Sequence, residues 1–436
     1  MKLVFFGFLF FIFPTFSTSL EFVIDTSSYE PMNLLCIVEN RLSLKGVPDD
    51  VHSFVQEYIG PLLGATRQFD VVVRSEEIPK TKKQMQHILA DGFPLALFFE
   101  GDNRSLTWRL YDTMSLYQIK GKMHKRGLLP RYQWALDVAE TIWPELTSQR
   151  GSFSSLIVAG KHKSSKSNRI TRDLHLIHPF YTREIFEPIK LVSRGNNLAP
   201  RWHSRRDVIF FSQHTSVNVR LMSVDPYNNV RTITSFDGQN MTPSLSKEGR
   251  VVMSLSRDSH THLYEYVFDK KQHKGSFKRL TPRGGDFISP SFINEDEVVF
   301  CHINELNVPS LGTLNLKNKK ITWLKLGRAL CPAASPFGDK IAFCKRADSA
   351  YQLWIYDCAT KQEEQITRCV GSKDECSWSP CGNYLVCCVE KGDSSRLAIV
   401  DVHTKVLRYI TSDNEEWSYP SWSPHLSIPF SFGKIA

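Results

Sequence analysis

Sequence motifs that mark common enzyme active sites are missing from this chain of 436 residues. It contains no G-x-S-x-G, no H-E-x-x-H and no G-x-G-x-x-G, which argues against serine hydrolases, zinc peptidases and dinucleotide-binding enzymes. His260 and His262 stand close together, but we expect them to be solvated in a loop. The alternative function is that of an exported enzyme, peptidase-like or carbohydrate-active, with its site in the channel of a propeller. It stays open because the sequence alone does not show whether two carboxylates lie close enough together to act as a catalytic pair.

Long apolar runs are also scarce. Residues 3–13 form an apolar run behind Lys2, and the small residues Ser17 and Ser19 follow it in the arrangement that a signal peptidase reads. Such a run is too short for a membrane-spanning helix, which needs about 20 residues. We therefore expect a signal peptide over residues 1–19 and an exported mature chain that is peripheral to a membrane at most. A retained membrane anchor is the alternative.

Strong charge and metal-binding patterns are absent as well. The net charge of +9 is modest for this length and could favour an acidic partner or an anionic membrane surface. No motif that reads nucleic acid occurs, so no nucleic-acid partner is expected. The ten cysteines form no C-x-x-C pair and are interpreted as small buried hydrophobes, without a metal or cofactor. Cys387 and Cys388 are neighbours on one expected strand, so we expect one of them in the core.

Residues 20–151 mix the periods of helices and strands. Apolar residues recur at helical spacing over 51–63. Strand patterns follow at 69–74, 94–100 and 106–112. A last helix is expected over 135–146, where Pro144 should kink or shorten it. Together these patterns predict a compact α/β domain over residues 20–151.

The chain after Gly151 repeats itself. A short unit recurs at intervals of 42 to 47 residues: Pro200-x-Trp202, Pro243-x-Leu245, Pro290-x-Phe292, Pro332-x-Ala334, Cys376-x-Trp378 and Pro420-x-Trp422. Each unit is followed by three further strand patterns, and four strands in about 40–45 residues is the period of propeller blades. Gly338 and Gly382 stand in Ser-Pro-x-Gly turns, where a tight hairpin needs a positive φ.

The two ends of the repeat region complement each other. The first repeat lacks the leading strand, whereas the last repeat, from Pro420, has that strand and little else. We therefore expect both ends to share one blade, which leaves no open sheet edge. The predicted fold is an α/β N-terminal domain followed by an all-β six-bladed β-propeller over residues 152–436.

The order of these parts resembles the TolB family of the Tol-Pal envelope system. LTWRLYD at 106–112 is similar to a strand of that family that ends in Leu-Tyr-Asp, and residues 135–153 are similar to its closing helix and link. WSP at 378–380 and the terminal YPSWSPHL at 419–426 resemble its repeat and its chain end. The resemblance covers nearly the whole chain.

This resemblance implies a periplasmic scaffold that binds proteins, is not an enzyme, and supports outer-membrane integrity and constriction during cell division. Its expected partners are a peptidoglycan-associated lipoprotein, bound by one propeller face, and an inner-membrane TolA-like protein, bound through residues 20–32. For residues 20–32 a plain edge strand is the alternative interpretation.

The partner face is expected at the loops before the innermost strands, because loops on a rigid scaffold commonly carry binding groups. Interface hot spots favour aromatic and arginine anchors. The predicted anchors are Phe287, Trp417 and Arg328, and the predicted polar contacts are Gln239, Asn240 and Glu416. For Trp417 the alternative is packing against a neighbouring loop.

Overall fold

The computed structural model describes residues 30–39, 50–163, 171–180, 187–193, 195–203, 206–216, 218–236, 241–257, 260–269, 274–392, 394–412 and 415–426. The expected signal peptide, most of the segment 20–32, Gln239 and Asn240 lie outside these residues. Across the described part of the chain, no helix is both long enough and apolar enough to span a membrane.

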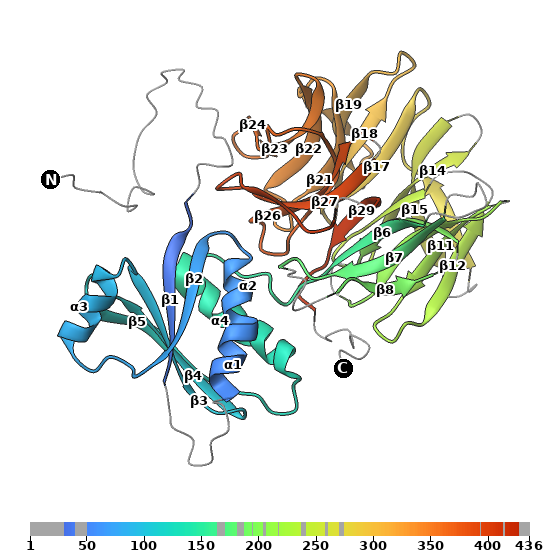
Figure 1. Ribbon diagram of the computed structural model, residues 1–436. Helices are drawn as coiled ribbons and strands as arrows, with labels where there is room; N and C mark the ends of the chain where they lie inside the picture. The colour runs from blue at the N-terminus through green and yellow to red at the C-terminus, as the bar shows by residue number, and fades with distance from the viewer. Residues whose placement is uncertain are drawn as a thin grey trace, which may run out of the picture.

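The N-terminal region is built on one five-stranded sheet in the order β2-β1-β3-β4-β5 (Figure 1). Its strands are β1 (Met32–Glu39), β2 (Phe69–Glu76), β3 (Leu95–Gly101), β4 (Ser105–Asp112) and β5 (Tyr117–Lys125). Strand β1 pairs in parallel with β2 and β3, and the remaining pairs are antiparallel. Strands β2 and β5 therefore form the two edges.

Helices cover both faces of this sheet. One face packs against a helical stretch made of α1 (Asp50–Phe54), the π-helical turn η2 (Val55–Ile59) and α2 (Gly60–Gly64), together with α4 (Arg131–Thr147). The other face packs against α3 (Lys82–Ala90), whose buried Met85 and Ile88 join a separate apolar cluster. Thr81 and Gln84 form a capping box that starts α3.

The expected elements of this region are present, with one correction. The helix over 51–63 and the three predicted strands are confirmed. The helix around Pro144 is longer than expected, because α4 continues through Pro144 to Thr147. Pro144 lies in the last turn, where only one intrahelical hydrogen bond is lost. Strands β1 and β5 and helix α3 were not predicted.

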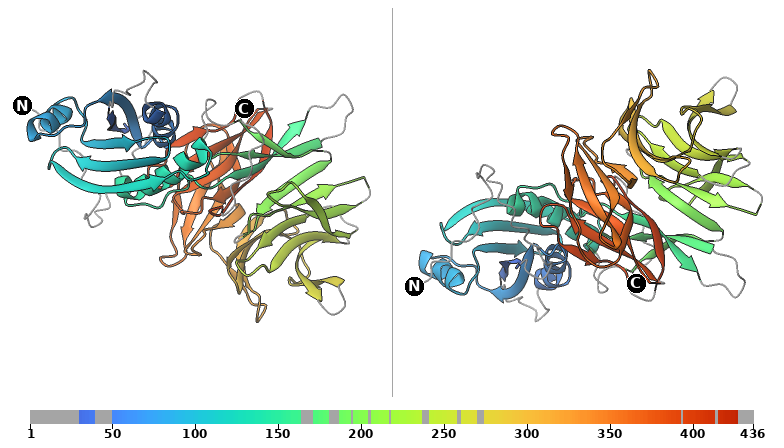
Figure 2. Two further views of the ribbon diagram at one scale, coloured as in Figure 1. Left: turned by 90° about the horizontal axis from the view of Figure 1, so that it is seen from below. Right: turned by 90° about the horizontal axis from the view of Figure 1, so that it is seen from above.

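The repeat region is entirely β in its described residues, and it forms four four-stranded sheets and one eight-stranded sheet. Its strands are β6 (Ile157–Lys163), β7 (Thr171–Ile177), β8 (Ile189–Val192), β9 (Asn196–Trp202), β10 (Ile209–His214), β11 (Val219–Val224), β12 (Val230–Phe236), β13 (Met241–Leu245), β14 (Val251–Arg257), β15 (His260–Asp269), β16 (Lys274–Arg279), β17 (Asp286–Asn294), β18 (Glu297–Ile303), β19 (Pro309–Asn315), β20 (Ile321–Trp323), β21 (Ala329–Ala334), β22 (Lys340–Ala347), β23 (Ala350–Asp357), β24 (Glu363–Gln365), β25 (Ser372–Trp378), β26 (Tyr384–Lys391), β27 (Ser394–Asp401), β28 (Leu407–Tyr409) and β29 (Trp417–Trp422). Figure 2 shows this region beside the N-terminal sheet in both views.

Apolar residues of the repeat region collect between consecutive sheets. One cluster joins side chains of β22 and β23 to side chains of β25, β26 and β27. A strand between two such clusters is covered on both faces, so Cys387 and Cys388 are both buried. The prediction that one of them is in the core is confirmed, and its neighbour is buried as well. Gly338 and Gly382 have φ of 73° and 75°, which confirms the prediction for their turns.

The last strand of the chain joins the first strand of the repeat region. Strand β29 pairs with β6 in antiparallel fashion, as predicted for the strand that starts near Pro420. Strand β29 also contacts β25 on one side and β9 on the other. The chain ends of the repeat region thus meet in one sheet.

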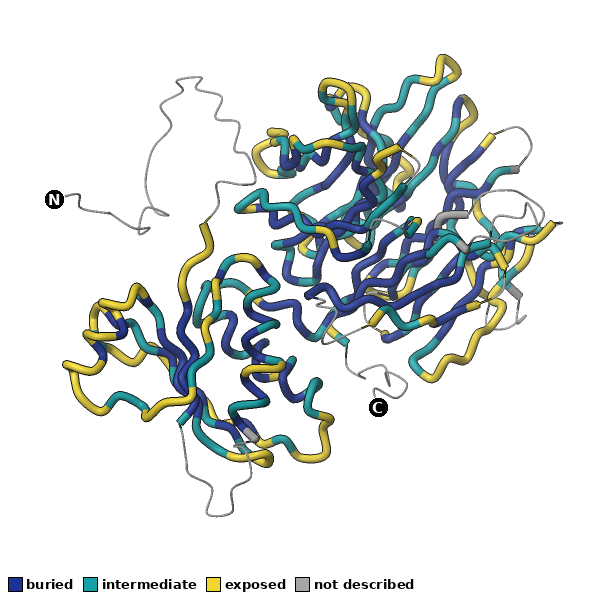
Figure 3. The backbone as a smooth tube through the Cα atoms, in the orientation of Figure 1, coloured by how far each residue is buried: buried dark blue, intermediate teal, exposed yellow. Residues whose placement is uncertain are grey.

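The two regions share an apolar cluster at their junction. This cluster contains Trp143 of α4 and also Phe180, Tyr384 and Trp422 of the repeat region. A Cβ at Gly151 would lie 2.5 Å from a carboxylate oxygen of Glu140, so a larger residue in this link would require the Glu140 side chain to move. Figure 3 shows buried backbone running through the junction from α4 into the first strands of the repeats.

Candidate functional site

A recurring bulge occurs in the strands predicted to be innermost, which are β9, β13, β17, β21, β25 and β29 and are called the innermost strands below. Residues with positive φ and a side chain occur at the same place in five of these strands: Ala199, Ser289, Cys331, Glu375 and Tyr419, with φ between 47° and 55°. The pairing register shifts beside each of them. Bulges re-aim side chains and interrupt pairing, and positive φ is uncommon for residues other than glycine. The repeats therefore hold these residues in a special conformation within five of the inner strands.

A cluster of charged residues surrounds two of these bulges. The Glu375 carboxylate accepts a hydrogen bond from the backbone N–H of Tyr419. Burial and, to a smaller extent, the neighbouring Asp374 carboxylate raise the pKa of Glu375 to about 8, whereas Arg201 opposes the shift. Burial also raises the pKa of Asp374 to about 6, with a contribution from Glu390. Near neutral pH this site can therefore hold protons on carboxyl groups.

Two predicted anchors are packed inside the fold. Phe287 is 2% exposed, and its ring lies 4.5 Å from that of His302 and 5.9 Å from that of His262. Both His262 and His260 lie on strand β15, so the expectation of a loop is wrong. His262 is buried, whereas His260 is exposed to solvent as expected. A buried ring does not present a surface to a partner. A binding role for Phe287 stays a prediction that would require its ring to leave this packing.

Trp417 is the second packed anchor. It is fully buried, its indole N–H donates to Glu415 Oε2 at 2.9 Å, and the Lys161 ammonium lies 5.2 Å from its ring. Lys161 also forms an ion pair with Glu415. These contacts agree with the alternative interpretation, in which Trp417 packs against neighbouring elements.

The predicted charged contacts are exposed. Arg328 precedes strand β21, and Glu416 precedes strand β29. Glu416 Oε2 lies 2.7 Å from His162 Nδ1. Both residues stand at the start of an innermost strand, so the repeat topology places them at the same end of the sheets. We call the described residues that directly precede the innermost strands the rim.

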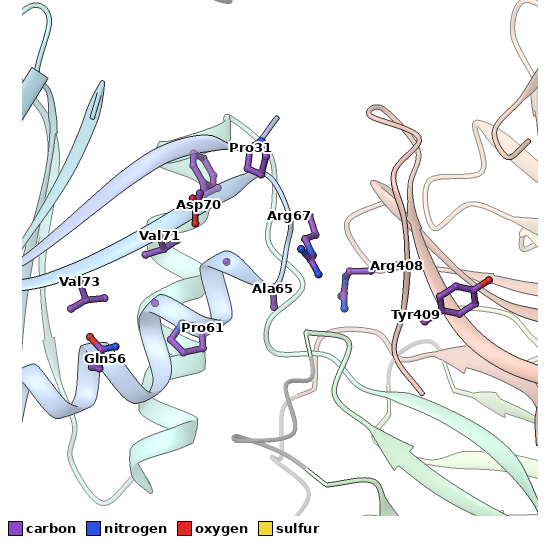
Figure 4. A pocket seen from close by; sticks show the side chains of 13 residues that line it. Pro31, Gln56, Pro61, Ala65, Arg67, Asp70, Val71, Val73, Arg408 and Tyr409 are labelled. Carbon is purple, nitrogen blue, oxygen red and sulfur yellow. The ribbon is translucent and has the colours of Figure 1, made fainter. Parts of the chain in front are cut away.

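A groove lies between the N-terminal sheet and the repeat region (Figure 4). Its volume is about 680 Å³. One wall comes from the edge strand β2 and from helix α2, and the other comes from β28. Pro31, which directly precedes strand β1, also lines the groove. The chain therefore enters strand β1, the neighbour of the edge strand β2, at this groove.

Two arginines face each other in the groove. Arg67 comes from the turn after α2, and Arg408 comes from β28. Burial and, to a smaller extent, the positive charge of Arg67 lower the pKa of Arg408 to about 10. Arg408 donates a hydrogen bond to the carbonyl of Pro179, and among the described residues neither guanidinium has a carboxylate partner within 4.0 Å. This pair favours an anionic occupant.

Sequence reasoning did not identify the groove. Arg67 and Arg408 belong to different regions and stand far apart along the chain, so neither spacing nor period connects them. Arg67 also adopts a positive φ of 64°, which no residue pattern in the surrounding sequence predicts. The described ranges hold no group of three or more His, Cys, Asp or Glu side chains that could hold a metal ion.

Comparison with known proteins finds a matching family profile and a related sequence. The family profile of the TolB beta propeller domain matches residues 143–426. The chain is 49% identical over 63 residues to the Protein TolB homolog of Protochlamydia amoebophila (strain UWE25), a match that covers 14% of this chain and only 13% of that relative.

Solved structures extend the likeness in fold. The crystal structure of TolB from Acinetobacter baumannii has a TM-score of 0.74, with 19% identity, and the match covers 91% of this chain and 97% of that one. The Kuenenia stuttgartiensis hydrazine synthase has a TM-score of 0.51 at 10% identity, over 65% of this chain and 48% of the other. At these identities the likeness concerns the fold alone.

Proposed function

Because the chain belongs to the TolB β-propeller family, we propose that it is a periplasmic protein-binding scaffold of a Tol-Pal envelope system and not an enzyme. In this role it supports outer-membrane integrity and constriction during cell division. One observation carries the proposal: the helix-and-sheet region and the repeat region together match the fold of a TolB protein over 91% of the chain. A match to the repeats alone would not distinguish a scaffold from other propellers.

We propose further that the repeat region is a six-bladed ring. In this interpretation the eight-stranded sheet is two blades, β29-β6-β7-β8 and β9-β10-β11-β12, joined by a single parallel bridge between Arg172 and Asn196. The contacts of β29 with both β25 and β9 support closure between the last and first repeats. Such a ring is a rigid platform whose rim loops can vary without loss of the core.

The rim is the proposed binding face for a peptidoglycan-associated lipoprotein. Arg328 and Glu416 are exposed there, and the buried charged cluster of Arg201, Asp374 and Glu375 lies behind the bulges. Arginine and carboxylate groups on a rigid rim suit charge-assisted hydrogen bonds to a partner chain. Gln239 and Asn240 remain proposed contacts of the same face.

The segment 20–32 is the proposed contact for an inner-membrane TolA-like protein. Only its last residues are described, and Glu30, Pro31 and Met32 are exposed. Because Pro31 lines the groove, the preceding residues start within reach of Arg67 and Arg408. The segment contains Glu21, Asp25 and Glu30, which are complementary in charge to that pair. We propose that the segment packs in the groove when free and leaves it to bind the partner.

Co-purification tests the proposed function. The mature chain, residues 20–436, carrying an affinity tag at its C-terminus, is incubated with envelope extract of the same organism, and bound proteins are identified by mass spectrometry. A peptidoglycan-associated lipoprotein enriched at least tenfold over a tag-only control is the expected result. Its absence from the bound fraction, while the chain remains folded by circular dichroism, contradicts the proposal.

Hydrogen exchange tests the N-terminal segment. In the free chain, we expect the backbone amides of residues 20–29 to show intermediate protection from exchange. The double variant Arg67→Glu with Arg408→Glu should reduce this protection, because the groove then repels the acidic segment. Lys317→Glu, a single charge reversal on the exposed hairpin between β19 and β20, is the control for a change of surface charge away from the groove. Strong protection that none of these variants alters supports a plain edge strand instead.

A further inference from the structure

An exposed apolar side chain stands at the rim, just before strand β25. Val370 is 72% exposed and precedes the first residue of β25 by two positions. It follows the short outer strand β24, so it lies in the loop that leads from one sheet to the next. Single exposed apolar residues are ordinary on protein surfaces. What distinguishes Val370 is the way in which its backbone is held.

A buried lysine holds the backbone of this loop. Lys373 is 0% exposed, and its ammonium group donates hydrogen bonds to the carbonyl oxygens of Cys369, of Val370 at 3.0 Å and of Gly371 at 2.7 Å. An ammonium group has three N–H donors. One side chain therefore satisfies the carbonyls of three successive residues, which turn inward while the Val370 side chain stays exposed.

Two further contacts fix the same loop. Gln352 Nε2 donates a second hydrogen bond to the carbonyl oxygen of Cys369, at 3.0 Å. Gly371 has a φ of 88°, and a Cβ there would lie 2.7 Å from the carbonyl oxygen of Glu390. Glycine permits both this conformation and this close approach. The backbone on each side of Val370 is thus held by contacts to the body of the repeat region.

The way this loop is built favours a role beyond connecting two strands. A lysine is almost never fully buried, because removing an ammonium group from water is costly. The carbonyls of a surface loop can bind water instead, so a simple connection does not need a buried lysine. A side chain on a backbone that is already ordered loses little freedom when a partner covers it, which favours binding. The loop therefore has the features of a preorganised binding element.

The surroundings of Val370 indicate what kind of surface would fit it. Arg368 is exposed two residues before Val370. Arg328 is exposed just before β21, a strand that contacts β25. Both arginines carry a positive charge beside the apolar side chain. A partner surface with a small apolar patch bordered by carboxylates would be complementary to this part of the rim.

We propose that Val370 is an apolar anchor of the rim for a partner surface of this kind, and that Lys373 is the residue that positions it. This inference rests on the proposed function, because its occupant is the lipoprotein proposed to bind the rim. Val370 contacts the partner directly. Lys373 does not, and acts only by holding the carbonyls of residues 369–371.

Titration calorimetry with the purified peptidoglycan-associated lipoprotein of the same organism, lacking its lipid, tests the anchor. Val370→Asp places a carboxylate in the apolar contact and should weaken binding at least tenfold at an unchanged melting temperature. Tyr227→Asp is the matched control, because Tyr227 is also 72% exposed and lies in the turn between β11 and β12, at the end of the sheets opposite the rim. Each variant adds one negative charge, and the control should bind as the wild type does.

The two possible failures of this titration are distinguishable. Wild-type affinity in the folded Val370→Asp variant overturns the anchor and leaves the proposed function in place. A wild-type chain that does not bind the lipoprotein contradicts the proposed function, and the anchor with it.

A double-mutant cycle tests the positioning role of Lys373. Val370→Ala should weaken binding about fivefold, since apolar contact is lost, and Lys373→Met should weaken it to a similar extent. In the Val370→Ala background, Lys373→Met should change the affinity by less than about 1.5-fold, because the residue that it positions is gone. Losses that multiply would show that Lys373 acts without Val370, which overturns its positioning role.

Hydrogen exchange supplies a readout that does not depend on the partner. In the free Lys373→Met variant, the backbone amides of residues 369–371 should exchange at least tenfold faster, whereas those of strand β26 keep their wild-type rates. Unchanged exchange at residues 369–371 overturns the positioning role. If Lys373→Met does not fold, Gln352→Leu, which removes the other donor to the Cys369 carbonyl, takes its place in both measurements, with the same outcomes deciding.

Discussion

The N-terminal region and the repeat region bury their apolar residues in different ways. The N-terminal sheet has one apolar cluster on each face, and its edge strand β5 is exposed along almost its whole length. In the repeat region the clusters lie between sheets, so a strand such as β26 is buried on both faces. A stacked arrangement makes each sheet depend on its neighbours, whereas a single covered sheet tolerates change at its free edge.

Removal of the last strand should have the largest effect on this arrangement. Truncation after Ser418 deletes most of β29 and exposes the backbone edge of β6. It also removes Trp422, which is buried in the cluster shared by both regions. We expect aggregation or loss of cooperative thermal unfolding in calorimetry. Truncation after Leu426 is the control, and melting of the shorter chain within a degree or two of this control contradicts the shared sheet.

A buried ring between two sheets should come next. Phe287→Ala removes a ring packed against Phe300 and His302, and such truncations cost about 3–5 kcal/mol. Phe268→Ala is the matched control, because Phe268 is 51% exposed and should cost less than about 0.5 kcal/mol. Urea unfolding measures both. Equal free energies of unfolding for the two variants would place Phe287 at the surface.

The buried carboxyl of Glu375 should have an intermediate effect that depends on pH. Its folded pKa of about 8 exceeds the ordinary value of about 4.3. The folded chain therefore keeps a proton that the unfolded chain releases, and stability falls as the pH rises between these values. Glu375→Gln should raise the melting temperature at pH 8 by about 2–5 °C and flatten its pH dependence. If the melting temperature of the variant depended on pH as that of the wild type does, the pH dependence would belong to another group.

The smallest effect is expected at the exposed edge of the N-terminal sheet. Ile119 and Met123 on β5 are 40% and 59% exposed. Ile119→Thr and Met123→Thr keep strand-forming backbones and should change the free energy of unfolding by less than about 0.5 kcal/mol each. Urea unfolding of the two variants checks this. A loss above about 2 kcal/mol would mean that β5 is covered in solution, for example by a partner or a second copy.

Repetition explains why the strands of the repeat region were predictable from sequence. Each strand pattern occurs several times at a regular interval, so one ambiguous segment is corrected by the others. In the N-terminal region each element occurs once. Strand β1 is buried on both faces and reads as one apolar run, while β5 is exposed on both faces and shows no alternation. Neither pattern marks a strand reliably.

The candidate site was predictable only in part. The sequence identifies the residues before each inner strand, and Arg328 and Glu416 are exposed there as a contact would require. It does not reveal that Phe287 and Trp417 turn into the fold, because the direction of a ring depends on bulges and on neighbouring strands. The groove between Arg67 and Arg408 arises only when the two regions pack together.

Binding of the lipoprotein by rim variants tests the central claim most directly. The mature chain and the double variant Arg328→Glu with Glu416→Lys are titrated calorimetrically with the purified peptidoglycan-associated lipoprotein of the same organism, lacking its lipid. The double variant keeps the net charge, and Lys317→Glu with Glu364→Lys, two exposed reversals away from the rim, is the control. We predict at least tenfold weaker binding for the rim variant at an unchanged melting temperature, and wild-type affinity for the control. Wild-type affinity in the folded rim variant would contradict the assignment of the partner face.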